Sequence, residues 1–170
     1  MMKMIRTTAF MALTALAIGT PQQAHAVSSE GPDQVEEARA LQLEAQKLAT
    51  SVDRLGEAAK LYRRAAQLFG QHPEAAQAWA WAGRLSYYDG SDQTLTDLRK
   101  AGEMALRFGN VGLAAHSFLD AAWVAHEKGM NAEAIDFAGR ATDLGQSPLL
   151  TASDRERIQR RVEGTGAVSG

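Results

Sequence analysis

The chain of 170 residues has no cysteine, only four prolines and few aromatic residues (6%). Without cysteine it has no disulfide, no thiol nucleophile and no attachment point for the lipid anchor of bacterial lipoproteins. Alanine dominates its apolar residues, β-branched residues are few, and no segment has the pattern of a strand. Alanine has the highest helix propensity, and its small side chain lets helices approach closely. The composition therefore predicts an all-α fold.

The first 26 residues have the pattern of an export signal. Lys3 and Arg6 precede an uncharged, mostly apolar stretch over residues 7–19, and Ala24-His25-Ala26 supplies the small residues that signal cleavage requires. The apolar stretch is too short to span a bilayer, which takes about 20 residues. We expect cleavage between Ala26 and Val27 and a periplasmic or secreted location. The alternative is an ordinary N-terminal helix.

The charge that remains after cleavage restricts the partners. Loss of Lys3 and Arg6 leaves 16 of the 18 basic residues against 20 acidic ones, which is a formal charge of −4. This balance argues against nucleic acid, because phosphates require a basic surface. With no cysteine to carry a lipid, we expect no stable membrane anchor after cleavage. The size suits one domain, so we divide the chain into a signal peptide (1–26), a flexible leader (27–34), a helical domain (35–163) and a disordered tail (164–170).

Within the domain, apolar residues recur at spacings of three and four, and glycine, proline and asparagine interrupt them. Asn131 is expected to cap one helix, and Thr151 with Asp154 has the spacing of a capping box. The pattern predicts seven helices, over residues 35–49, 51 or 53–69, 73–88, 92–108, 111–128, 131–145 and 151–162.

Two short motifs recur at a fixed distance. The first is an aromatic residue followed by small residues three and four positions later, and it occurs twice, 39 residues apart, as Trp79, Ala82 and Gly83 and as Phe118, Ala121 and Ala122. The second recurs after 76 residues, as Ala58, Tyr62 and Ala65 and as Ala134, Ala138 and Ala141. A period in this range is typical of stacked repeat arrays.

These motifs resemble the tetratricopeptide repeat (TPR), over residues 38–148. Trp79, Ala82 and Gly83 match the first helix of that repeat, and the motif that begins at Ala58 matches the second. The repeat here is longer than the family's, and Gln42 and Arg99 stand where larger apolar residues are usual. The resemblance implies a degenerate three-repeat array of antiparallel helix pairs, stacked as a right-handed solenoid with a C-terminal capping helix. The alternative is a non-repeating helical bundle.

Such arrays bind partners along a concave face that the first helices of the repeats line. Helical spacing from Trp79 and Phe118 places six residues on that face, and they form a candidate partner-binding groove: Lys47, Arg84, Tyr87, His116, Trp123 and His126. Aromatic residues and arginine are enriched at binding hot spots. The family's carboxylate clamp is not expected, because these helices contain no asparagine. The alternative is that the tryptophans serve packing and the histidines are surface residues.

The sequence has few features of a catalytic or metal-binding site. His116 and Asp120 are spaced to share a helix face, but one such pair is a poor metal site. No nucleophile elbow, zinc-protease motif or glycine-rich phosphate loop occurs. We expect no enzyme activity, no cofactor and no metal. Four arginines of the last helix are expected to point into solvent: Arg155, Arg157, Arg160 and Arg161.

Three functions remain open at this point. The first is a non-catalytic interaction module that binds a peptide or protein partner in the concave groove. The second is a self-assembling structural subunit of the cell envelope, in which the aromatic residues form a homo-oligomer interface. The third is a small helical hydrolase or carbohydrate-binding domain without a recognisable motif.

Overall fold

The computed structural model describes residues 31–164. The expected signal peptide, residues 27–30 of the leader and residues 165–170 of the tail lie outside the described residues. Residues 31–164 form helices and loops without a strand, which confirms the all-α prediction, and no helix among them is both long and apolar enough to cross a membrane. The helices are α1 (Pro32–Leu48), a 3-10 turn η1 (Val52–Arg54), α2 (Leu55–Phe69), α3 (Glu74–Tyr88), α4 (Thr94–Arg107), α5 (Val111–Glu127), α6 (Asn131–Gly145) and α7 (Ala152–Gly164).

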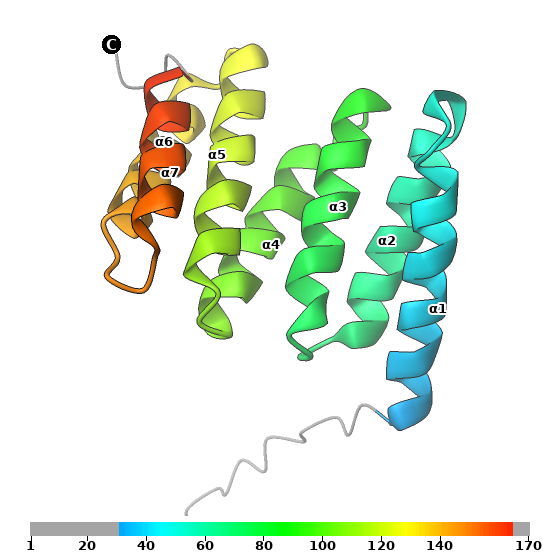
Figure 1. Cartoon of the computed structure of the whole chain (residues 1–170). Helices are drawn as coiled ribbons and strands as arrows, with labels where there is room; N and C mark the ends of the chain where they lie inside the picture. Colours follow the sequence, from blue (N-terminus) through cyan, green and yellow to red (C-terminus); the bar gives the residue numbers. More distant parts are fainter. Residues whose placement is uncertain (1–30, 165–170) are drawn as a thin grey trace, which may run out of the picture.

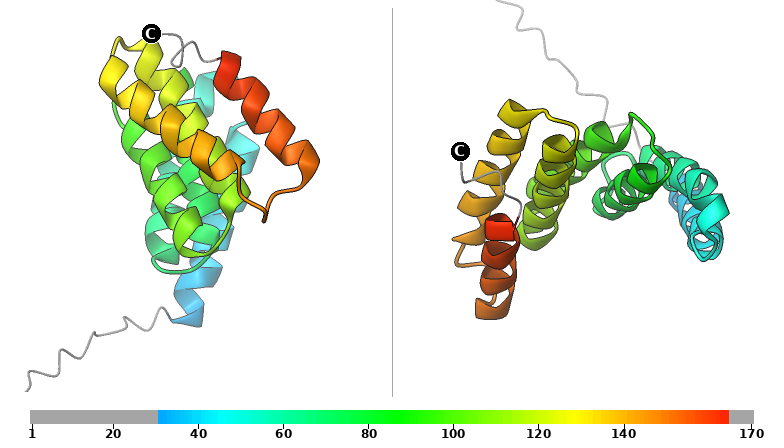
Figure 2. Two further views of the ribbon diagram at one scale, coloured as in Figure 1. Left: turned by 90° about the vertical axis from the view of Figure 1, so that its left-hand side faces the viewer. Right: turned by 90° about the horizontal axis from the view of Figure 1, so that it is seen from above.

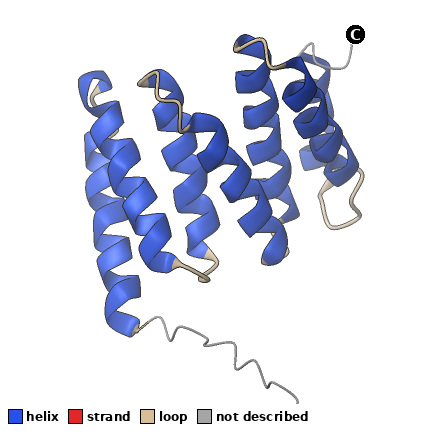
Figure 3. Ribbon diagram, turned by 180° about the vertical axis from the view of Figure 1, so that it is seen from behind, coloured by secondary structure: helices blue, strands red, loops and turns tan. Residues whose placement is uncertain are grey.

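Each helix packs against the next one along the chain, and the loops between them are short (Figures 1 and 3). In Figure 1, α1, α3 and α5 lie in front of α2, α4 and α6. The last helix, α7, contacts both α6 and α5. Seen from above, the helices follow an arc that is open on the side of α1, α3, α5 and α7 (Figure 2). We call this side the concave face.

The start of α1 and the cap of α6 differ from the prediction. α1 begins at Pro32, three residues before the expected start at Val35, because proline is tolerated at the first position of a helix. The cap expected at Asn131 is wrong, since Asn131 is itself the first residue of α6 and no side chain caps that helix. Asn110 does cap α5, because its side chain accepts a hydrogen bond from the backbone N–H of Leu113.

The repeated motifs form much of the core. Trp79 is only 6% exposed and Phe118 is fully buried. The small residues that follow them on α3 and α5 are also buried. Phe118 stacks on Phe137 of α6 with 6.2 Å between the ring centroids. The prediction that Trp79 is a core residue is therefore confirmed.

Glycine at two core positions lets neighbouring helices approach closely. A Cβ on Gly83 of α3 would lie 2.6 Å from Cγ of Leu98 on α4. A Cβ on Gly102 of α4 would lie 2.5 Å from Cε1 of Phe118 on α5. Distances this short do not occur between carbon atoms in packed proteins, so an added methyl group would push these helices apart.

A buried ion pair joins three helices. Asp97 of α4 is 1% exposed and accepts hydrogen bonds from Nη2 and Nε of Arg63 on α2, at 2.6 and 3.0 Å. Nη2 of Arg63 also donates to Oγ of Ser86 on α3, at 3.0 Å. Removal of either charge would leave its partner poorly solvated, so the pair fixes the relative positions of α2, α3 and α4.

The substitution Gly102→Ala should destabilise the fold by up to about 2 kcal/mol. The clash with Phe118 costs about 1–3 kcal/mol, as overpacking does, and the better helix propensity of alanine offsets about 1 kcal/mol of it. Gly139→Ala is the matched control, because Gly139 lies inside α6 and no atom of another helix is within 4 Å of the added Cβ. It should stabilise by about 0.5–1 kcal/mol. Urea unfolding measures both. Equal stabilisation by the two substitutions would contradict the close approach of α4 and α5.

Candidate functional site

A pocket of about 260 Å³ opens between α3 and α5. We call it the aromatic pocket, because four aromatic side chains line it: Trp81, Tyr87, Tyr88 and Trp123. Three aliphatic side chains and the charged pair Arg84 and Asp120 complete its lining. Tyr87 and Trp123 contact each other across the two helices, with ring centroids 4.6 Å apart and planes tilted by 58°.

Helix geometry explains why these aromatic residues are not in the core. An α-helix turns by about 100° per residue. Trp81 follows the core residue Trp79 by two positions and therefore points about 160° away from it. Trp123 follows Phe118 by five positions and lies about 140° further round α5. Trp81 and Trp123 are accordingly 41% and 39% exposed.

A second hollow of about 650 Å³ lies between α1 and α3. We call it the glutamine pocket, because Gln42, Gln46 and Gln77 line it, together with Arg39, Thr50 and several apolar side chains. Tyr62 of α2 also lines it and stacks on Trp81, with centroids 6.2 Å apart. Trp81 and Leu85 line both hollows, so the two adjoin across α3. We call the two hollows together the groove.

A charged network borders the aromatic pocket. Nε of Arg84 donates to Oδ2 of Asp120 at 2.7 Å, and Nη2 of Arg161 on α7 donates to Oδ1 of the same carboxylate at 2.5 Å. Asp120 is largely buried, and the two arginine side chains are partly exposed. Two guanidinium groups therefore share one carboxylate, which leaves this border with an excess of positive charge.

His116 joins this network through Arg161. Nη1 of Arg161 lies 3.3 Å from Nδ1 of His116. A guanidinium can only donate, so Nδ1 accepts and the proton of the neutral ring is on Nε2. Burial lowers the pKa of His116, and the positive charge of Arg161 lowers it further, while Asp120 acts in the opposite direction. The ring is thus held neutral at neutral pH and adds no charge to the network.

Arg161 does not lie where the sequence predicts. Arg161 was expected to point into solvent but lies against α5, because Asp120 offers it a largely buried carboxylate. A different set of arginine contacts does have a regular spacing in the sequence. Three arginines pair with carboxylates about 35 residues further on: Arg39 with Glu74, Arg63 with Asp97 and Arg84 with Asp120, which are 35, 34 and 36 residues apart.

Of the six predicted groove residues, some line the aromatic pocket and others do not. Arg84, Tyr87 and Trp123 line the aromatic pocket, and His116 is linked to it through Arg161 and Asp120. Lys47 and His126 are exposed and line neither the aromatic pocket nor the glutamine pocket. Trp81, Tyr62 and Tyr88, which the prediction left out of the site, lie in the lining.

No group of three or more metal-binding side chains gathers within residues 31–164. His116 and Asp120 do lie close together, but both are engaged by Arg161. A cation held between them would meet the positive charge of that guanidinium. The pair is therefore better described as a hydrogen-bonded network than as a ligand set.

Comparison of the chain with protein-family models, with curated proteins and with solved structures finds no match. The resemblance to the TPR family accordingly depends on the motif residues alone.

Substitution of two tryptophans should show that Trp79 stabilises the core more than Trp123 of the groove does. Trp79→Ala should lower the free energy of unfolding by about 3–5 kcal/mol, as truncation of a buried aromatic residue does. Trp123→Ala should lower it by less than about 2 kcal/mol, because Trp123 is 39% exposed and its main aromatic neighbour is Tyr87. Chemical denaturation of both variants tests this. If Trp123→Ala is the more damaging of the two, the assignment of faces on α5 is wrong.

Proposed function

We propose that this protein is an exported, non-catalytic interaction module that binds a peptide segment of a protein partner in its concave groove. The observation that carries the proposal is the row of partly exposed aromatic side chains around the groove, next to a partly exposed arginine. Tryptophan, tyrosine and arginine are the residues most enriched at binding hot spots.

Trp81, Tyr88 and Trp123 are not core residues. Trp79, Phe118 and Phe69 fill the spaces between the helix layers. Trp81 and Tyr88 instead present large apolar surfaces to solvent, at 41% and 73% exposure. A cluster of exposed aromatic residues in a hollow is a feature of interaction sites. Binding of a partner would remove this surface from water, which supplies the driving force.

The repeat architecture is part of the proposal. We take α1 with α2, α3 with α4 and α5 with α6 as three TPR-like pairs in a right-handed array. We take α7 as the cap, since Leu150, Ile158 and Val162 are buried at that end. In such an array the groove is preformed, so a partner would bind without refolding it. The export signal over residues 1–26 would place the domain in the periplasm or outside the cell.

Self-assembly is the second candidate, and the same aromatic residues motivate it. A homo-oligomer interface would also bury Trp81, Tyr88 and Trp123. Stable interfaces of that kind are more apolar and carry fewer unpaired charges than the border of this groove, where two arginines share Asp120. We therefore rank a peptide-binding role first.

Affinity capture from an envelope extract tests the proposed function. The bait is the chain from Val27 onward, which contains every described residue. A genuine groove partner should be retained by this chain and lost with the double substitution Trp123→Ala and Arg84→Ala. The matched control is Arg99→Ala with Ile135→Ala, an exposed arginine and an exposed apolar residue on α4 and α6. Equal capture by both double variants would place binding elsewhere.

A further inference from the structure

We propose that the aromatic pocket takes one bulky apolar side chain of the bound peptide, and that Arg84 binds a carboxylate next to that side chain. The ligand class is therefore an acidic peptide segment with an apolar anchor residue. This inference rests on the proposed function and specifies the chemistry of the same groove.

The size of the aromatic pocket favours an anchor residue. Small-molecule sites have volumes of about 300–1,000 Å³ and enclose most of the ligand. The aromatic pocket, at about 260 Å³, is below that range and is open to solvent. The rings of Trp123 and Tyr87 form one wall, with Leu98 and Val124 also in the lining. Such a lining is suited to a single apolar side chain projecting from a chain that continues along the groove.

Arg84 has unused hydrogen-bond donors at the aromatic pocket. Its Nε is bonded to Asp120, but neither Nη1 nor Nη2 has a hydrogen-bond partner within residues 31–164. Its guanidinium carbon lies 5.5 Å from the ring centroid of Trp81, so the group is held over an aromatic face at the pocket. Two parallel N–H groups match the two oxygens of a carboxylate, and this bidentate contact is among the strongest hydrogen-bond arrangements.

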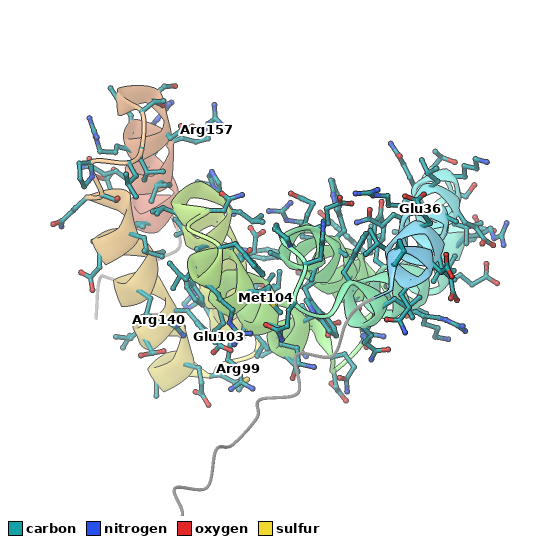
Figure 4. All side chains as sticks on the ribbon, turned by 90° about the horizontal axis from the view of Figure 1, so that it is seen from below. Glu36, Arg99, Glu103, Met104, Arg140 and Arg157 are labelled. Atoms are coloured by element: carbon teal, nitrogen blue, oxygen red, sulfur yellow. The ribbon has the colours of Figure 1, made fainter. Side chains whose placement is uncertain are left out.

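The surrounding charge is complementary to an anion. Both oxygens of Asp120 are bonded to a guanidinium group, one to Arg84 and one to Arg161, so its negative charge is already balanced. The positive charge of Arg157 also reaches His116. Arg157 projects from α7 toward the concave face, whereas Arg99 and Arg140 lie on the opposite side of the arc (Figure 4). Three arginines against one carboxylate make this border positive in a chain whose formal charge is −2.

The same geometry disfavours a cationic ligand. Aromatic rings arranged around a pocket bind ammonium groups in many proteins. Here Arg84 already occupies a cation-binding position over Trp81, and the only carboxylate of the lining is neutralised by two arginines. A lysine or a quaternary ammonium in the pocket would meet a positive border with no free counter-charge.

Nuclear magnetic resonance of the indole N–H groups tests the inference. The chain has three tryptophans, so the ¹⁵N-labelled protein from Val27 onward gives one indole signal for each. The probe is a blocked peptide Gly-Asp-Phe-Asp-Gly. We expect saturable shifts of the Trp81 and Trp123 signals with a dissociation constant near or below about 1 mM, while buried Trp79 does not respond. Added salt should weaken the binding.

Matched peptides and variants identify each contact. Exchange of phenylalanine for glycine, or of both aspartates for asparagine, should weaken binding at least about tenfold. Arg84→Gln should do the same, because a hydrogen bond to a charged group contributes about 1.5–3 kcal/mol. Arg99→Gln, on the opposite face, should leave binding unchanged. An unshifted Trp79 signal in each variant shows that the fold is intact.

Three results would overturn the inference in distinguishable ways. Equal binding of the asparagine peptide, or of one with lysines for aspartates, would keep the groove as a peptide site but remove the acidic specificity. Shifts caused by an N-acetylglucosamine trisaccharide and by none of the peptides would point to a glycan and would also remove the proposed function. No shift with any probe would mean that the aromatic pocket takes no anchor of this kind.

Discussion

The ring of Phe118 lies so close to the backbone of Gly102 on the neighbouring helix that no side chain fits between them. Leu98 meets Gly83 in the same way one helix earlier. Contacts of this kind, between a large residue on one helix and a small one on the next, set the spacing of the helices along the arc. Most other buried positions are alanines, which leave little freedom for the helices to shift. The rest of the structure depends on this close and regular packing.

Because the core residues set the rotation of each helix, they also set which residues face the open side. With Trp79 and Phe118 turned inward, Trp81 and Trp123 necessarily point to the concave face. The arginine–carboxylate pairs then connect α1 with α3, α2 with α4 and α3 with α5, and the pair of Arg84 with Asp120 lies at the aromatic pocket. The groove is therefore a consequence of core packing, and its border is positive because α7 adds Arg161 to a carboxylate that is already paired.

The helices and their buried faces could be predicted from the sequence, because alanine spacing and the aromatic motifs are local signals. Arg84, Tyr87 and Trp123 could be placed together by counting helical turns from Trp79 and Phe118. The bond between Arg161 and Asp120 could not, since it depends on how α7 folds back on α5. Lys47 and His126 share a predicted stripe with the groove residues, but a stripe along a helix extends beyond a pocket that spans only part of it. The prediction that Asn131 caps α6 is wrong because the cap position is occupied by Met130, and Asn131 follows it as the first residue of the helix.

If the groove binds a partner, the concave face is open in the free protein and copies of the chain do not cover it. The mass of the chain from Val27 onward, measured by light scattering over a range of concentrations, tests this. We expect the mass of a single chain at every concentration. A dimer or larger assembly that returns to single chains with Trp123→Ala would contradict it, because the aromatic residues would then serve contacts between copies of this protein.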